Sequence, residues 1–207
     1  MRLVILGGSG SGKSTQAQRL CRYFEIPMIS TGEILRETIS GDKLLPEFQW
    51  SEADPRTSLS VYASLSELGY HARPYMQKGE LVPDETIVEL IRIRLRQPDI
   101  NGDWVLEGYP RTAFQAEELD FLLDNLEQKL DWAIYLQVPE AVIVSRSLGR
   151  SLPDDQPEIV QRRVELFYDR TIPILEYYDR RRCLLTINGD QSPDMVLQNI
   201  LTLLSVP

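Results

Sequence analysis

The residues best suited to chemistry in this sequence are residues 7–14, which read GGSGSGKS and match the phosphate-binding pattern G-x-x-x-x-G-K-[ST]. Glycines let the backbone curl so that several N–H groups converge on one anion. Lys13 can add a mobile positive charge for the terminal phosphates, and the Ser14 hydroxyl is placed to meet a magnesium ion. The stretch therefore predicts a nucleotide-phosphate site.

The flanking residues supply the structural context that this pattern needs. An apolar run at residues 3–6 predicts a short buried strand before the loop. Ala17, Leu20, Cys21 and Phe24 then recur at helical spacing, which predicts a helix directly after it. Strand, glycine loop and helix together favour a ligand site over a glycine-rich turn that binds nothing.

Four further stretches carry residues that suit phosphate chemistry. Each has an ordinary explanation when taken alone, such as an exposed helical arginine, a helix cap, a turn or a surface charge pair. The stretches are residues 30–36 (STGEILR), 79–85 (GELVPDE), 108–115 (GYPRTAFQ) and 146–150 (RSLGR) with Asp154, Asp155 and Arg163 after it.

Taken together, these stretches favour a site for two nucleotides. Ligands of open parallel sheets bind beyond the carboxyl ends of the strands, and several of the stretches follow predicted strands. Phosphoryl transfer between two polyanions needs several cations to hold both phosphates in line. Arg36 and Arg111 could hold one phosphate, and Lys13, Arg150 and Arg163 the others. The single histidine, His71, leaves no Ser-His-Asp set.

The remaining pattern predicts the fold class. Five short apolar runs alternate with amphipathic helical segments, which indicates an α/β protein: a five-stranded parallel sheet with helices on both faces, as in P-loop NTPases. The predicted strands are residues 3–6, 27–29, 104–107, 132–138 and 183–187.

Between the second and third strands, residues 30–79 predict a small helical subdomain. We expect one helix up to Ser40, a second that ends at Gly69 and a third over residues 70–78 that ends at Gly79. Asp84 is expected to cap the next helix. A long helix over residues 157–182 is expected to bend at Pro173.

Composition narrows the function further. A net charge of −9 over 207 residues argues against binding to nucleic acid or to an anionic membrane. No apolar run is long enough for a membrane span, and the first strand begins too early to leave room for a targeting peptide. Cys21 and Cys183 form no metal or redox motif. We expect a cytoplasmic protein, working as a monomer on small molecules.

The phosphate loop with Gln16, together with STGEILR, GELVPDE, GYPRT and RSLGR in this order, resembles the adenylate kinase family. The resemblance covers nearly the whole chain. It implies reversible transfer of phosphate from MgATP to AMP, giving two ADP. It also implies a P-loop core (residues 1–29, 80–146 and 156–207), an AMP-binding helical subdomain (residues 30–79) and a short lid (residues 147–155).

The resemblance also implies roles for individual residues. Lys13, Arg111, Arg150 and Arg163 would be catalytic, and Ser14 and Asp84 would serve the magnesium ion, Asp84 through water. ATP would be held by Gly8, Ser9, Gly10, Ser11, Gly12, Lys13, Ser14, Thr15 and Arg146, and AMP by Thr31, Gly32, Arg36, Glu80, Leu81, Val82, Gly108, Arg111 and Gln115. Thr31 and Thr112 resemble the AMP-specific version of the acceptor site.

The sequence departs from the family pattern in several places, including Ser14, which replaces a frequent glycine and restores the general phosphate-loop pattern. Glu33 replaces an aspartate, and Leu152 stands where we expect a further lid arginine, a role that Arg162 or Arg170 would then have to fill. An insertion at about residues 43–67, which includes Trp50, enlarges the helical subdomain. Two alternatives therefore stay open: a kinase that accepts UMP or CMP, and a nucleotide-binding sensor whose turnover is impaired by the reduced lid.

Overall fold

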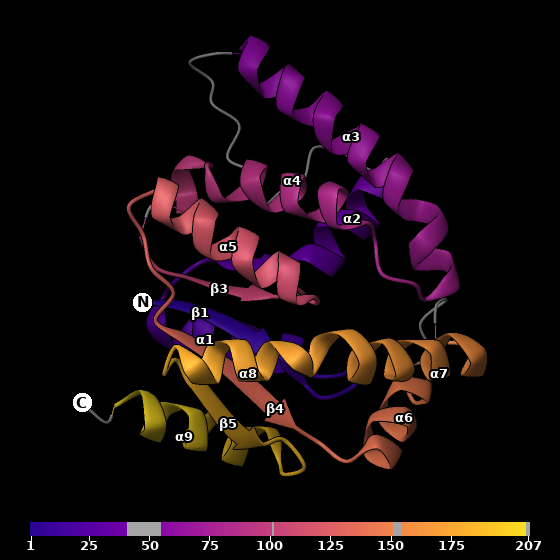
Figure 1. Cartoon of the computed structure of the whole chain (residues 1–207), viewed down its shortest axis with the longest axis vertical. Coiled ribbons are helices and arrows are strands. Elements are labelled where there is room, and N and C mark those ends of the chain that lie inside the picture. Colours follow the sequence, from indigo (N-terminus) through magenta and orange to yellow (C-terminus); the bar gives the residue numbers. More distant parts are fainter. Residues whose placement is uncertain (41–54, 101, 151–154, 206–207) are drawn as a thin grey trace.

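The computed structural model describes residues 1–40, 55–100, 102–150 and 155–205. Its centre is a sheet of five parallel strands in the order β2-β3-β1-β4-β5. The strands are β1 (Arg2–Leu6), β2 (Met28–Ser30), β3 (Trp104–Glu107), β4 (Trp132–Gln137) and β5 (Leu184–Asn188). Figure 1 shows their carboxyl ends pointing to one edge. The predicted fold class is confirmed, with the five strands in the predicted places.

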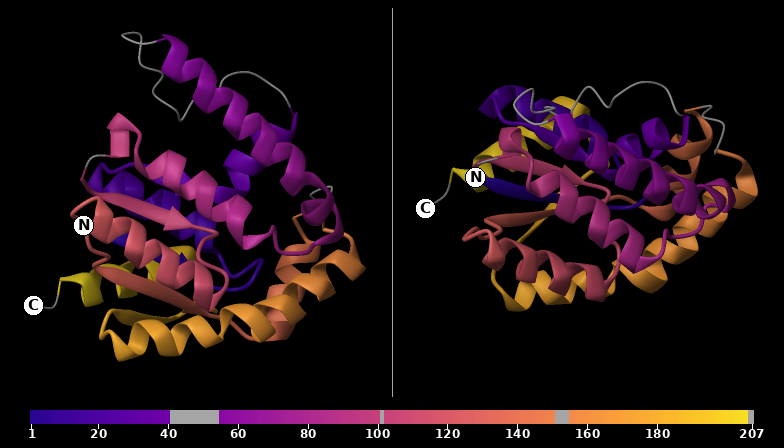
Figure 2. Two further views of the ribbon diagram at one scale, coloured as in Figure 1. Left: turned by 45° about the horizontal axis from the view of Figure 1, so that its top comes forward. Right: turned by 90° about the horizontal axis from the view of Figure 1, so that it is seen from above.

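Helices cover both faces of the sheet, as the three views together show (Figures 1 and 2). These helices are α1 (Lys13–Phe24), α4 (Asp84–Leu95), α5 (Ala113–Asn125), α6 (Glu140–Leu148), α7 (Pro157–Leu166), α8 (Pro173–Arg180) and α9 (Pro193–Leu204). On β1, Leu3 and Ile5 face one side and pack with α1 and α9, while Val4 and Leu6 face the other side and pack with α4, α5 and α8. This alternation follows from the period of two in a strand.

Two further helices form a layer beyond α4. Helix α2 (Thr31–Ser40) begins directly after β2, where the Ser30 hydroxyl accepts a hydrogen bond from the Glu33 backbone N–H, as expected of a cap. Helix α3 (Pro55–Lys78) packs against both α2 and α4 (Figure 1). The predicted insertion at residues 43–67 lies partly outside the described residues, and Trp50 lies outside them altogether.

The predicted helix break at Gly69 is wrong, because α3 continues without interruption to Lys78. Gly69 is instead a point of close contact between helices. A Cβ atom there would lie 2.5 Å from Cγ2 and 2.9 Å from Cβ of Thr38 on α2. The glycine therefore lets α2 and α3 approach each other, and the predicted end at Gly79, with φ of 69°, is confirmed.

Two other predictions concern the start of α4 and the long helix around Pro173. Pro83, and not Asp84, precedes the first turn of α4, so the predicted cap is wrong. The carboxylate of Asp84 is engaged elsewhere, in the site described below. The long helix predicted to bend at Pro173 is divided near that position, because a π-helical turn, η2 (Phe167–Thr171), separates α7 from α8.

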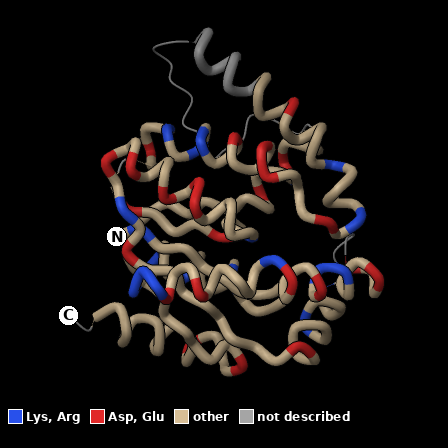
Figure 3. Tube along the Cα trace, in the orientation of Figure 1, with Lys and Arg blue, Asp and Glu red and all other residues tan. Residues whose placement is uncertain are grey.

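Charge is spread over the molecule. Figure 3 shows Lys and Arg interspersed with Asp and Glu along the described part of the chain. A short 3-10 turn, η1 (Pro98–Ile100), holds Asp99, which pairs with the buried Arg94 at 2.7 Å. Within the described ranges, no helix has the length and apolar character needed to cross a membrane.

The close contact at Gly69 yields a stability prediction. Gly69→Ala should lower the free energy of unfolding by about 1–3 kcal/mol in chemical denaturation, although alanine favours a helix by about 1 kcal/mol. The control is Gly149→Ala, where a Cβ atom would meet only Ser145 O at 3.4 Å and Arg146 O at 3.7 Å. That change should stay within about 0.5 kcal/mol. A Gly69→Ala protein as stable as the parent would contradict the packing described.

Candidate active site

One cavity of about 630 Å³ opens at the carboxyl edge of the sheet. Every strand contributes to it through the segment that follows the strand, which is where open parallel sheets bind ligands. With the exception of Asp84, it brings together all the residues predicted for the site. These are Gly8, Ser9, Gly10, Ser11, Gly12, Lys13, Ser14, Thr15, Thr31, Gly32, Arg36, Glu80, Leu81, Val82, Gly108, Arg111, Gln115, Arg146, Arg150 and Arg163.

The phosphate loop connects β1 to α1. Gly10 and Gly12 have φ of 85° and 94°, conformations that glycine adopts without strain and that curl the loop around the cavity. Lys13 is the first residue of α1, and its Nζ donates to the Gly8 carbonyl oxygen at 2.8 Å. The side chain therefore folds back over the loop, into the space where an anion would lie.

Lys13 lies among other cations. Burial is the main cause that lowers its pKa to about 8, and the nearby Arg111, Arg150 and Arg163 contribute to this shift, while Glu107 acts in the opposite direction. The ammonium group is thus less stable in this cavity than in water. A bound polyanion would restore the charged form.

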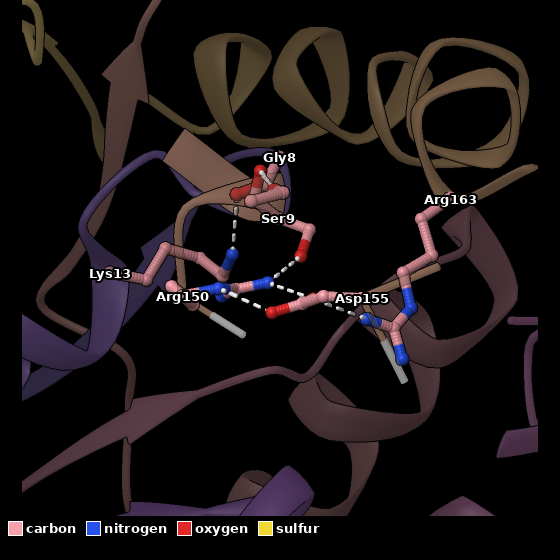
Figure 4. A network of polar contacts seen from close by, with 7 residues as sticks. Gly8, Ser9, Lys13, Arg150, Asp155 and Arg163 are labelled. Atoms are coloured by element: carbon pink, nitrogen blue, oxygen red, sulfur yellow. Dashed lines mark hydrogen bonds and ion pairs between the residues drawn. The ribbon is translucent and has the colours of Figure 1, made fainter. Parts of the chain in front are cut away.

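A cluster around a buried carboxylate holds two of these arginines (Figure 4). Only 1% of the Asp155 side chain is exposed, and its Oδ1 lies 2.8 Å from Arg150 Nη2 and 3.6 Å from Arg163 Nη1. Arg150 Nη2 also donates to Ser9 Oγ at 3.0 Å. Asp155 was not among the residues predicted for the site. The useful signal was its position between two arginines of the predicted site.

The other side of the cavity is built from the ends of β2 and β3. Glu107, the last residue of β3, is 6% exposed and accepts a hydrogen bond from the Ser30 hydroxyl at the end of β2. Arg111 folds back so that its Nε donates to the Gly108 carbonyl oxygen at 2.8 Å. A Cβ atom on Gly108 would lie 2.4 Å from Thr31 Oγ1, so only glycine fits beside that threonine.

Glu107 is a site residue that the sequence analysis missed. It is the only charged residue of an otherwise apolar strand, a pattern that marks a strand end facing a ligand site. It faces Lys13 and Arg111, whose charges it offsets.

Burial and the charges of Glu107 and Glu37 raise the pKa of Glu33, against the effect of Arg36. Glu33 itself does not line the cavity.

Asp84 lies behind the cavity wall and not in it. Its Oδ1 accepts hydrogen bonds from Gln115 Nε2 at 2.7 Å and from Thr112 Oγ1 at 3.3 Å. Gln115 in turn accepts one from the Arg111 backbone N–H at 2.7 Å. Asp84 therefore supports the segment that carries Arg111, through Gln115.

Arg146 lies at the far end of the phosphate loop. It donates to the Gly189 carbonyl oxygen at 3.1 Å and pairs with Asp190 at 3.0 Å, both in the segment after β5. Gly189, Gln191 and Pro193 line the same end of the cavity.

Neither of the two arginines considered as substitutes for a lid arginine reaches the cavity. Arg162 pairs with Glu165 at 3.5 Å and Arg170 with Asp169 at 3.2 Å, and all four side chains are at least half exposed. Leu152, which stands where a lid arginine was expected, lies outside the described residues.

Comparison with known proteins agrees with this geometry. The adenylate kinase family model matches residues 59–183. The chain is 74% identical over 206 residues to adenylate kinase 2 of Nostoc sp., covering 100% of both chains. It is 48% identical over 201 residues to adenylate kinase 2 of Synechocystis sp., covering 97% of this chain and 98% of that one. It is also 38% identical over 199 residues to adenylate kinase 1 of Nostoc sp., covering 96% of each. With its phosphate loop, its facing arginines and these full-length matches, the chain belongs to the adenylate kinase family.

Proposed function

We propose that this protein transfers the terminal phosphate of MgATP reversibly to AMP, giving two ADP. The observation that carries the proposal is the single cavity in which the phosphate loop faces Thr31, Arg36 and Arg111. One side suits a triphosphate, because loop N–H groups and Lys13 converge there. The other side suits a monophosphate, because two arginines can hold its oxygens.

The donor would lie along the loop, from Gly8 to Thr15, with its base toward Arg146. Lys13, Arg150 and Arg163 would stabilise the charge that develops on the transferring phosphoryl group. No general base is required, since the attacking phosphate oxygen of AMP is already ionised. The protein's task is to align two anions and to supply positive charge between them.

The acceptor would lie against the ends of β2 and β3. Arg36 and Arg111 would hold its phosphate, and Thr31, Gly32, Gly108 and Gln115 would line its binding site. Residues Glu80, Leu81 and Val82 also line the cavity, and they would contact the base. A UMP- or CMP-accepting kinase is not favoured, because the relatives that match over their full length are named adenylate kinases.

The residues present fit a magnesium ion that arrives with ATP. The Ser14 hydroxyl lies in the cavity wall next to Lys13. Asp84 does not line the cavity, and Gln115 and Thr112 donate to its Oδ1, so its carboxylate would act on the ion only through water. When bound, magnesium would neutralise part of the negative charge of the ATP phosphates. The described residues hold no cluster of three or more metal-ligating side chains, as expected if phosphates supply most of the ligands.

Two further proposals concern the oligomeric state and the cellular compartment of the protein. All residues of the proposed site come from one chain, so we propose that a monomer suffices. Both cysteines are free thiols, which fits a cytoplasmic enzyme.

A coupled assay of ADP formation tests the reaction. ATP with AMP should give ADP, and UMP, CMP and GMP should react far more slowly. Lys13→Met and Arg111→Ala should each lower kcat by about a thousandfold or more, because each removes a charge from the transferring or accepting phosphate. Arg162→Ala is the control, since this exposed neighbour of Arg163 lies outside the cavity, and it should keep near-normal activity. Tight ATP binding without any ADP formation would instead support the sensor alternative.

Asp155 should act through the arginines that it holds. Asp155→Asn should lower kcat by about ten- to a hundredfold, because Arg150 and Arg163 lose the charge that orients them. The KM for AMP should change little. Asp169→Asn, at an exposed carboxylate paired with Arg170, is the control and should leave kcat unchanged. Steady-state kinetics decide the matter, and an unchanged kcat in Asp155→Asn would reject this role.

The lowered pKa of Lys13 predicts proton uptake when MgATP binds. A lysine with a pKa of about 8 is partly neutral at pH 8.5, and the bound phosphates favour its charged form. Binding should therefore take up protons at pH 8.5, and much less at pH 7. Calorimetry in two buffers with different ionisation enthalpies measures this, and Lys13→Arg should abolish it. Equal heats in both buffers at pH 8.5 would show that Lys13 is already charged.

A further inference from the structure

Ser147 is a buried polar residue at the end of α6 to which the proposed reaction gives no role. It is 0% exposed, and its hydroxyl donates to the Ser9 carbonyl oxygen at 3.0 Å. Ser9 is the third residue of the phosphate loop, 138 positions earlier in the chain. A fully buried hydroxyl is normally kept because its hydrogen bond is needed where it lies.

The hydrogen bond belongs to a close contact between α6 and the loop. A Cβ atom on Gly10 would lie 2.6 Å from Ser147 Oγ and 2.7 Å from the Ile143 carbonyl oxygen. A Cβ atom on Gly8 would lie 2.8 Å from Ile143 Cδ1. Gly8 and Gly10 of the phosphate loop thus lie in close contact with α6, and this contact limits the conformations that the loop can adopt.

The direction of the Ser9 carbonyl determines the direction of the next N–H group. In a planar trans peptide the C=O and N–H bonds point to opposite sides. The Ser9 carbonyl points to α6, so the Gly10 N–H must point away from α6, and Gly10 lines the cavity. Phosphate loops bind anions through N–H groups oriented in this way.

We propose that Ser147 is a positioning residue for the donor phosphates: its hydroxyl fixes the Ser9–Gly10 peptide so that the Gly10 N–H faces the bound triphosphate. This rests on the proposed function for the identity of the ligand.

The same helix end also holds the side chain of Ser9. Arg150 follows Ser147 by three residues, its backbone N–H donates to the Ser147 carbonyl oxygen at 3.3 Å, and its Nη2 donates to Ser9 Oγ. Figure 4 shows the Arg150 guanidinium between Ser9 and Asp155. When phosphates draw Arg150 away from Ser9, the bond from Ser147 remains, and the loop keeps its shape.

Two variants and one control test the proposal. Ser147→Ala removes the donor, and Ser147→Cys nearly keeps the volume but offers only a weak donor. Each should weaken MgATP binding by about tenfold in calorimetry, because one phosphate-facing N–H is no longer held in place. The affinity for AMP should change less than twofold. Ser145→Ala, on the exposed face of α6, should alter neither affinity.

The outcomes separate positioning from simple support of the fold. Unchanged MgATP affinity in both Ser147 variants, or an equal loss for MgATP and AMP, would overturn the proposal. Nitrogen–proton spectra of the unmodified protein add an independent reading: the Gly10 amide signal should move when MgATP binds, and a signal that stays in place overturns the proposal as well. Absence of ADP formation by the unmodified protein would reject the proposed reaction but leave this binding test interpretable.

Discussion

The site depends on four positive charges held around one cavity. Lys13, Arg111, Arg150 and Arg163 would repel one another there, and each is held in place by an acceptor on the chain: the carbonyl oxygens of Gly8 and Gly108, and the buried carboxylate of Asp155. Glu107 adds a second buried negative charge between the two halves. Burial nevertheless lowers the pKa of Lys13, with a further contribution from the arginines. Anionic phosphates would favour the charged form of Lys13, which supports the proposal of a phosphate site.

The sheet makes this arrangement of charges possible. Parallel pairing places Ile5, Glu107 and Ser30 side by side at one edge, so the segments after β1, β3 and β2 begin next to one another. The phosphate loop, Arg111 and Thr31 lie on those segments. Helix α6, which follows β4, brings Arg150 and Ser147 to the loop from the other side. Donor and acceptor halves therefore face each other because of the strand order, although they are distant in the sequence.

Much of this could be predicted from the sequence, because local patterns carry it. The loop pattern and the apolar runs depend only on neighbouring residues, and they predicted the strands and the phosphate loop. The resemblance to adenylate kinases added the other site residues, and of all the residues predicted for the site only Asp84 does not line the cavity. The predictions that failed concerned residues whose contacts lie far away in the sequence. Glycine is typical of a helix end, but Gly69 lies inside α3, where it makes room for Thr38 of α2. Asp84 is a typical capping residue, but its carboxylate is bound by Gln115 and Thr112. Asp155 and Glu107 do carry a signal in the sequence, but the sequence alone does not show which positive charges each of them faces.

The central claim is that two nucleotides lie end to end in one cavity, with these cations between them. The most direct test is calorimetric titration with a bisubstrate analogue in which two adenosines are joined through five phosphates. One analogue should bind per chain, more tightly than ATP or AMP alone, and saturation with either nucleotide should weaken its binding. Binding of two analogues per chain, or competition with ATP but not with AMP, would contradict the account.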